Sequence, residues 1–103
     1  MNQINVIELN NLLEEKKITL IDVREDFEIQ ICSIKGSVFI PMSQIPASID
    51  TLNSETSYAV ICHSGIRSMS VTNFLINHNF NAVNVIGGIN EWAISIDPTM
   101  KQY

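Results

Sequence analysis

Residues 62–68, Cys-His-Ser-Gly-Ile-Arg-Ser, hold the side chains best suited to chemistry. Cys62 supplies a nucleophilic sulfur, and Arg67 adds a permanent positive charge a few residues later. Gly65 allows a tight path in which successive backbone N–H groups turn inward, and the start of a following helix adds unpaired N–H groups and the positive end of its dipole. All of these features favour an anion. A site that favours an anion lowers the pKa of a thiol, and the segment therefore predicts that Cys62 is a reactive thiolate.

The other residues of this loop belong to the same predicted anion site. The side chains of adjacent residues usually point apart, so His63 is expected to offer its backbone N–H group while its ring lies at the rim. Ser64 and Ser68 could donate hydroxyl hydrogen bonds to a bound anion, and Ser68 could equally bond to the backbone of the first helical turn. We predict Cys62 as the catalytic residue and a substrate pocket lined by His63, Ser64, Gly65, Ile66, Arg67 and Ser68.

The segments around the loop alternate between strand and helix patterns. This alternation predicts an α/β fold with a mainly parallel sheet and helices on both faces. Ligands of such sheets bind beyond the carboxyl ends of the strands, and Cys62 stands at the end of the most apolar strand candidate. The predicted strands span residues 18–23, 37–40, 58–62 and 82–86, and predicted helices span residues 25–31, 43–52 and 67–77, with a last helical turn around Trp92 and a polar tail from Asp97.

Two predicted helices carry boundary signals. Asn5 followed three residues later by Glu8 resembles a capping box, and it predicts a helix that runs from this cap to Lys16 or Lys17. Asn79 follows the helix at 67–77, at a position where a left-handed residue commonly ends a helix.

Length and composition restrict the class of protein. The 103 residues fit one domain, residues 1–103, and 46% hydrophobic with 17% charged residues is a globular balance. Six Lys+Arg against eleven Asp+Glu give a net charge of −5, which argues against nucleic acid and against an anionic membrane surface as partners. No long apolar edge calls for a second chain, so we expect a monomer.

The cysteines and the N-terminus indicate a compartment. Cys32 and Cys62 are too few for a disulfide framework or a structural zinc site, so we expect no metal. Residues 1–7 lack the positive flank and apolar run of a signal peptide, and no apolar run approaches membrane-spanning length. We therefore expect a cytoplasmic protein whose thiols stay reduced.

Three segments together resemble the rhodanese-like domain family, and the resemblance covers nearly the whole chain. The segment 21–25 is similar to the Asp-Val-Arg strand end of the family, the loop 62–68 has its four-residue spacing between Cys and Arg, and the segment 85–92 is similar to its Gly-Gly…Trp ending. The resemblance implies a rhodanese-like fold, a mainly parallel central sheet of about five strands flanked by helices on both faces.

The resemblance also implies an activity, that of a sulfurtransferase. The Cys62 thiolate would take the sulfane sulfur of thiosulfate or of a persulfide donor, and the Cys62 persulfide would pass that sulfur to a thiol, a protein thiol among the candidates, or to cyanide. Loop N–H groups would hold the terminal sulfur, and Arg67 would help to bind an anionic donor. No metal or organic cofactor is needed.

The family's first and last motifs contain further polar residues. Asp22 and Arg24 are expected to support the site as a charged pair that braces neighbouring loops, and Glu25 and Glu28 are candidate partners of Arg24. Gly87 and Gly88 predict a tight turn, and Trp92 a core position.

One segment departs from the family pattern. Where many relatives have Gly-His-Ile, this chain has Cys32-Ser33-Ile34. Cys32 is expected to be a small buried residue, and the alternative is a resolving thiol that forms a disulfide with Cys62.

Two other functions fit the same residues. A Cys…Arg anion loop also serves phosphatases and arsenate reductases, but the related phosphatase loop is one residue longer, and the spacing from Cys62 to Arg67 therefore favours sulfur. A rhodanese-like binding or regulatory module is the second alternative. Such modules often lack the loop cysteine that this chain retains.

Overall fold

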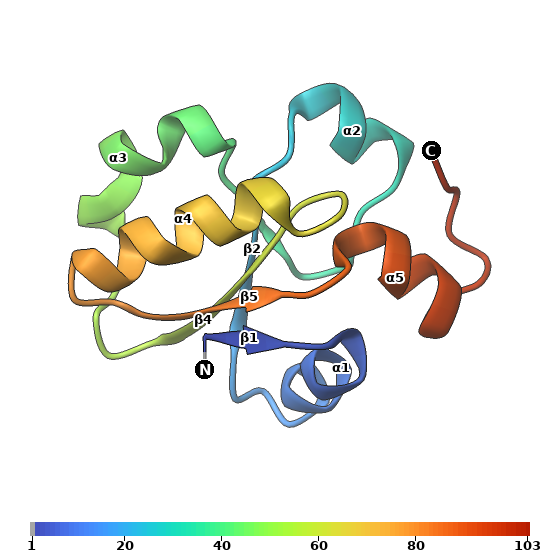
Figure 1. Cartoon of the computed structure of the whole chain (residues 1–103), viewed down its shortest axis with the longest axis horizontal. Coiled ribbons are helices and arrows are strands. Elements are labelled where there is room, and N and C mark those ends of the chain that lie inside the picture. The colour runs from blue at the N-terminus through green and yellow to red at the C-terminus, as the bar shows by residue number, and fades with distance from the viewer. Residues whose placement is uncertain (1) are drawn as a thin grey trace.

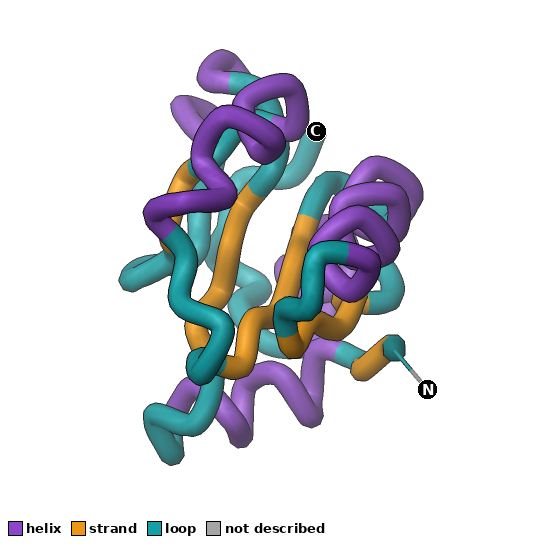
Figure 2. Tube along the Cα trace, turned by 90° about the vertical axis from the view of Figure 1, so that its left-hand side faces the viewer, coloured by secondary structure: helices purple, strands orange, loops and turns teal. Residues whose placement is uncertain are grey.

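The computed structural model describes residues 2–103 and contains a five-stranded sheet in which all neighbouring strands run parallel. The strand order is β1-β5-β4-β2-β3, and helices lie on both sides of the sheet (Figures 1 and 2). The strands are β1 (Gln3–Ile4), β2 (Thr19–Asp22), β3 (Val38–Phe39), β4 (Ser57–Ile61) and β5 (Asn81–Val85). The helices are α1 (Val6–Glu14), α2 (Asp26–Ile31), α3 (Ile45–Ser48), α4 (Ile66–Asn77) and α5 (Gly88–Ser95), with two 3₁₀ turns, η1 (Met42–Gln44) and η2 (Ile49–Thr51). Within residues 2–103, no helix is long and apolar enough to cross a membrane.

The sheet separates two hydrophobic cores. Along β4, Ala59 and Ile61 face the core formed with α1 and α5, while Tyr58 and Val60 face the core formed with α3 and α4. Because side chains alternate along a strand and both faces of β4 are covered, almost every residue of this strand is apolar and buried. The predicted α/β class, with a parallel sheet covered on both faces, is therefore confirmed.

The chain changes direction between β2 and β4. From β2 it proceeds outward to β3, then returns past β2 to β4 and continues to β5 on the other side. Ligand sites of open parallel sheets lie at such a reversal, outside the carboxyl ends of the two strands. The ends of β2 and β4 are Asp22 and Ile61, and they are paired in register, so the residues that follow them share one edge of the sheet.

Predicted element boundaries are right at the caps. Asn5 caps α1 through a complete capping box with Glu8, and Asn79 has a φ of +69° after α4. The first helix ends at Glu14, before the predicted Lys16 or Lys17, and Lys16 itself has a φ of +56°.

Three elements differ from the sequence-based prediction. The helix predicted at 43–52 is instead the succession η1, α3 and η2, which has Pro46 near its middle. Pro46 lies in the first turn of α3, where its missing backbone N–H is tolerated, but it cannot donate a hydrogen bond back to η1. The strand β1 was not predicted, because two residues carry no pattern until β5 pairs with them. The last helical turn is the eight-residue helix α5, which includes the buried Trp92.

The turn before α5 brings two backbone segments into contact. Gly87 and Gly88 have φ values of +80° and +57°, as expected for the predicted tight turn. A Cβ atom on Gly88 would lie 2.4 Å from the carbonyl oxygen of Cys62 and 2.6 Å from that of His63. A glycine is therefore needed at position 88 for two reasons: the backbone has a positive φ, and a side chain would collide with the Cys62 loop.

Gly88→Ala should lower the free energy of unfolding by about 2–4 kcal/mol, because strain from positive φ adds to a backbone collision. Gly36 is the matched control. It has a φ of +86°, but no atom lies within 4 Å of the Cβ that alanine would add. Gly36→Ala should cost about 1–2 kcal/mol, since it suffers the conformational strain alone. Urea unfolding followed by circular dichroism measures both, and equal losses would contradict the close approach at Gly88.

Candidate active site

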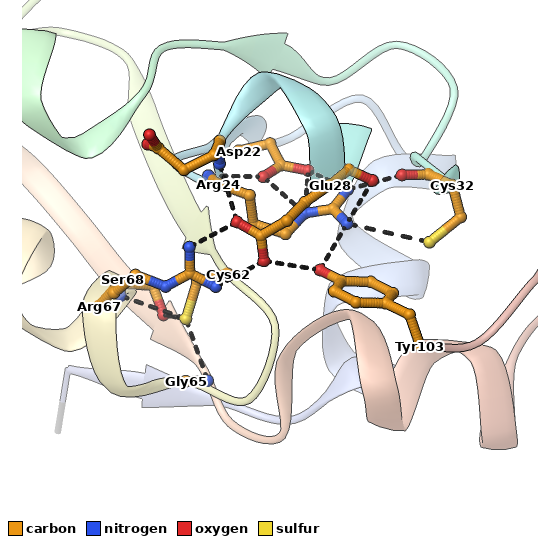
Figure 3. Close-up of polar contacts among 10 residues, drawn as sticks. Asp22, Arg24, Glu28, Cys32, Cys62, Gly65, Arg67, Ser68 and Tyr103 are labelled. Carbon is orange, nitrogen blue, oxygen red and sulfur yellow. Dashed lines mark hydrogen bonds and ion pairs between the residues drawn. The ribbon is translucent and has the colours of Figure 1, made fainter. Parts of the chain in front are cut away.

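The sulfur of Cys62 caps helix α4. Cys62 follows β4 directly, and its Sγ accepts hydrogen bonds from the backbone N–H of Gly65 at 3.1 Å and of Ser68 at 3.4 Å. The N-cap residue of α4 is Gly65, which has no side chain with which to cap the helix. Cys62 Sγ thus takes the place of the usual capping oxygen, and the unpaired N–H groups and dipole of the helix start are directed at the sulfur (Figure 3).

The N-terminus of α5 holds the loop from the opposite direction. The N–H of Ile89 donates to the carbonyl oxygen of Cys62 at 2.9 Å, and the N–H of Asn90 donates to that of His63 at 3.1 Å. These contacts pull the two carbonyl groups outward, away from the sulfur. The following N–H groups consequently turn inward, and Gly65 permits this path with a φ of +108°.

Two buried polar side chains complete the surroundings of the sulfur. The hydroxyl oxygen of Ser68 lies 3.3 Å from Cys62 Sγ and also donates to Asn84 Oδ1 at 2.5 Å. Asn84 lies on β5 and donates from Nδ2 to the carbonyl oxygen of Gly65 at 3.2 Å. Asn84 was not among the predicted site residues. The available signal was a polar residue within an otherwise apolar strand end.

These contacts act on the charge of Cys62. Burial raises the pKa of the thiol. Hydrogen bonds from the backbone N–H groups of Ser68, Gly65 and Ser64, and one from the Ser68 hydroxyl when its hydrogen turns to the sulfur, lower the pKa by more, so that it lies below that of an ordinary cysteine. A larger fraction of Cys62 is therefore thiolate near neutral pH, and the thiolate is the nucleophilic form of cysteine.

The loop forms a closed cradle around the sulfur, and the substrate pocket lined by residues 63–68 stays a prediction. Cys62 is 1% exposed, because the N–H groups that bind its sulfur pack directly against it. Ser68 is fully buried. Its hydroxyl group lies beside the sulfur and bonds to the side chain of Asn84, and not to the backbone of the first helical turn. Ser64 is exposed, and Ile66 is 78% exposed, so their side chains lie outside the cradle.

Asp22 and Arg24 form a fully buried ion pair at the end of β2. The guanidinium group binds both carboxylate oxygens of Asp22, and it also donates to the carbonyl oxygen of Cys32 at 2.8 Å. The Asp22–Arg24 pair is thus present as expected. Of the two further candidate partners of Arg24, Glu28 accepts a hydrogen bond through its backbone carbonyl oxygen at 3.4 Å. Burial without pairing would be costly for either charge.

Arg67 is bound to a carboxylate from another helix. Its two terminal nitrogens donate to Glu28 of α2 at 2.6 and 2.8 Å, a bidentate ion pair. Glu28 is 4% exposed and also accepts from the backbone N–H of Glu25. The two residues are 39 positions apart, and no local pattern in the sequence pairs them.

The C-terminal segment reaches the same site. Tyr103 accepts a hydrogen bond from Arg24 at 3.0 Å and donates one to Glu28 at 2.9 Å, so it links the two ion pairs (Figure 3). Its ring stacks on that of His63, with 4.1 Å between the ring centroids. The polar tail predicted from Asp97 therefore contributes an aromatic residue to the site.

Cys32 is buried, and its sulfur accepts a long hydrogen bond from Arg24 at 3.8 Å. Both cysteines are free thiols. Among residues 2–103, no group of three or more His, Cys, Asp or Glu side chains could hold a metal ion.

The fold and the site together define a class of protein. It is a parallel α/β domain that stabilises a cysteine thiolate between a central strand and a helix. The rhodanese-like domain model matches residues 5–95, and the chain belongs to this family.

Individual relatives agree with this assignment. The chain is 39% identical over 99 residues to a Bacillus subtilis protein named "Putative sulfurtransferase YtwF", and the match covers 95% of this chain and 96% of that one. A rhodanese-related protein from Thermoplasma volcanium has a similar crystal structure, with a TM-score of 0.87, 36% identity, and coverage of 93% of this chain and 94% of that one. A rhodanese-like domain protein from Staphylococcus aureus has a TM-score of 0.86 at 34% identity, and covers 100% of this chain and 99% of its own.

The Glu28–Arg67 pair should make stability depend on pH in acid. The hydrogen bonds from Arg67 lower the pKa of Glu28 from 4.5 to about 2. The carboxylate therefore stabilises the fold fully above pH 4.5, and this contribution is lost as the pH falls toward 2. Relative to Glu28→Gln, the wild type should lose about 2–3 kcal/mol over this interval, with some reduction by solvent around Arg67.

Urea unfolding at a series of acidic pH values measures the difference. Asp26→Asn, which removes an exposed carboxylate from the same helix, should keep the pH dependence of the wild type. If Glu28→Gln did the same, Glu28 would not be the group responsible.

Proposed function

We propose that the protein is a sulfurtransferase that carries sulfur on Cys62 as a persulfide. The observation that carries this proposal is the cradle of N–H groups around Cys62 Sγ, at 3.1 Å from Gly65 and 3.4 Å from Ser68. A persulfide carrier must hold a negative sulfur twice in each cycle, first as thiolate and then as the terminal sulfur of the persulfide. Oriented backbone dipoles in a site with little water suit that task.

The reaction divides into two displacements. In the first, the Cys62 thiolate attacks the sulfane sulfur of the donor, a new S–S bond forms, and the donor's own bond to that sulfur breaks. Thiosulfate would leave as sulfite, and a persulfide donor as a thiol. In the second, an acceptor thiolate or cyanide attacks the terminal sulfur and releases Cys62 as thiolate. Electrons and sulfur balance between donor and acceptor, so no metal or organic cofactor takes part.

The side chains around the site contribute little net charge. The side chains near the loop form two ion pairs, Asp22 with Arg24 and Glu28 with Arg67. Their charges cancel, and the attraction for an anion therefore comes mainly from the backbone N–H groups. Arg67 is the positive group with the greater exposure, 36% of its side chain, and we assign it the binding of anionic donors.

Access to the sulfur requires movement. Cys62 is 1% exposed, so side chains around the loop must shift when a donor or acceptor binds. The proposed partners are accordingly a small sulfur-containing anion or persulfide and an acceptor thiol.

Replacement of Cys62 should abolish the transfer. We expect Cys62→Ser to lower the thiosulfate:cyanide rate by a factor on the order of 10³ or more, because the nucleophile is lost. Cys32→Ser is the matched control and should leave the rate nearly unchanged. Thiocyanate formation measures the rate, mass spectrometry should detect one added sulfur in the wild type after thiosulfate treatment, and a phosphatase substrate run in parallel should stay intact. Turnover by Cys62→Ser near the wild-type rate would overturn the proposal.

Variants that remove the charge of Arg67, or that of its partner Glu28, test whether Arg67 binds anionic donors. Arg67→Ala should lower kcat/KM for thiosulfate, a dianion, by roughly tenfold, and that for an alkyl persulfide, which carries at most one negative charge, by less, because the lost interaction is attraction between charges. Glu28→Gln frees the positive charge of Arg67 and should raise kcat/KM for thiosulfate. Equal losses for both donors in Arg67→Ala would assign Arg67 a structural role.

A further inference from the structure

The single hydroxyl hydrogen of Ser68 has two possible acceptors, the sulfur of Cys62 and the side-chain oxygen of Asn84. The hydroxyl oxygen lies 3.3 Å from Cys62 Sγ and 2.5 Å from Asn84 Oδ1. The orientation of the Asn84 amide is determined by Gly65, whose carbonyl oxygen can only accept, so Nδ2 must face it. Oδ1 therefore faces Ser68, and because it too can only accept, the single hydroxyl hydrogen is given to Asn84.

This arrangement suits a protonated Cys62. With its hydrogen on Asn84, Ser68 presents a lone pair to the sulfur and can accept from the S–H group. A thiolate has no hydrogen to give, and it is stabilised if the Ser68 hydroxyl turns its hydrogen toward Sγ. That rotation leaves Asn84 Oδ1, on a residue that is 3% exposed, without its donor. A buried acceptor that loses its donor carries a free-energy cost, so the two positions of the hydrogen compete.

We propose that Asn84 is a positioning residue that competes with Cys62 for the hydroxyl hydrogen of Ser68. Asn84 would thereby limit how much of Cys62 is thiolate in the resting protein. When Cys62 carries a second sulfur, its Sγ is no longer charged, and the hydrogen returns to Asn84. The proposal rests on the proposed function in taking Cys62 as the nucleophile.

Other charges around the sulfur belong to several elements and could also influence its titration. Arg67 comes from α4, Glu28 from α2 and the Asp22–Arg24 pair from the end of β2, while His63 and Tyr103 stack beside the loop. None of these groups contacts Asn84 by a hydrogen bond among residues 2–103, so a change at Asn84 leaves their pairing in place.

The experiment measures the midpoint of the pH dependence of iodoacetamide alkylation of Cys62, in a Cys32→Ser background with a single thiol. Ser68→Ala removes the donor and should raise the midpoint. Asn84→Leu removes the competitor and should lower it by about 0.5–1 pH unit. The double variant should match Ser68→Ala, because Asn84 acts through Ser68. Asn81→Leu changes an exposed residue of the same strand and should leave the midpoint unchanged.

A purely structural role for Asn84 gives the opposite sign. If its loss merely loosened the loop, the N–H cradle would weaken and the midpoint would rise. A higher midpoint in Asn84→Leu, or a shift of the same size with and without Ser68, would overturn the proposal. Asn84→Ala is the second variant if the leucine variant does not fold, and the same lowering is expected. Alkylation does not depend on sulfur transfer. A wild-type protein without transferase activity would therefore overturn the proposed function and leave the proposal for Asn84 to be decided by the alkylation midpoints.

Discussion

A negative sulfur inside a protein needs oriented dipoles around it, and this requirement organises the carboxyl end of the sheet. Cys62 is 1% exposed and receives backbone N–H groups from its own loop and from the first turn of α4. For those groups to point inward, the carbonyl groups of residues 62 and 63 must point outward, where α5 binds them. Gly88, the first residue of α5, has no side chain, and this leaves room for the carbonyl groups of Cys62 and His63.

Charge is balanced around this centre in pairs. The Asp22–Arg24 pair is fully buried, and the Glu28–Arg67 pair is nearly so on the carboxylate side. Tyr103 joins the two pairs and stacks on His63 (Figure 3). Full pairing makes burial of these charges tolerable, and it leaves the backbone dipoles as the main attraction for an anion.

The fold brings these parts together through parallel pairing. Strands β2 and β4 are neighbours in register, and the chain reverses between them, so the ion pair after β2 and the cysteine after β4 share one edge. Two separate hydrophobic cores hold the sheet from either face. The polar site can therefore lie at the strand ends without interrupting the packing that keeps it rigid.

The local features of this protein follow from its sequence alone. The alternation of apolar strands with helices predicted the α/β class, the capping box predicted the start of α1, and the Cys62 loop with Gly65 predicted the anion cradle, because each depends on residues close together in the chain. Tertiary structure decided the partners. Arg67 meets Glu28 across 39 residues, Arg24 meets Tyr103 across 79, and Ser68 meets Asn84 across 16. Such contacts have no local signal, since side chains of compatible charge or hydrogen-bonding type occur throughout the chain and packing alone selects among them.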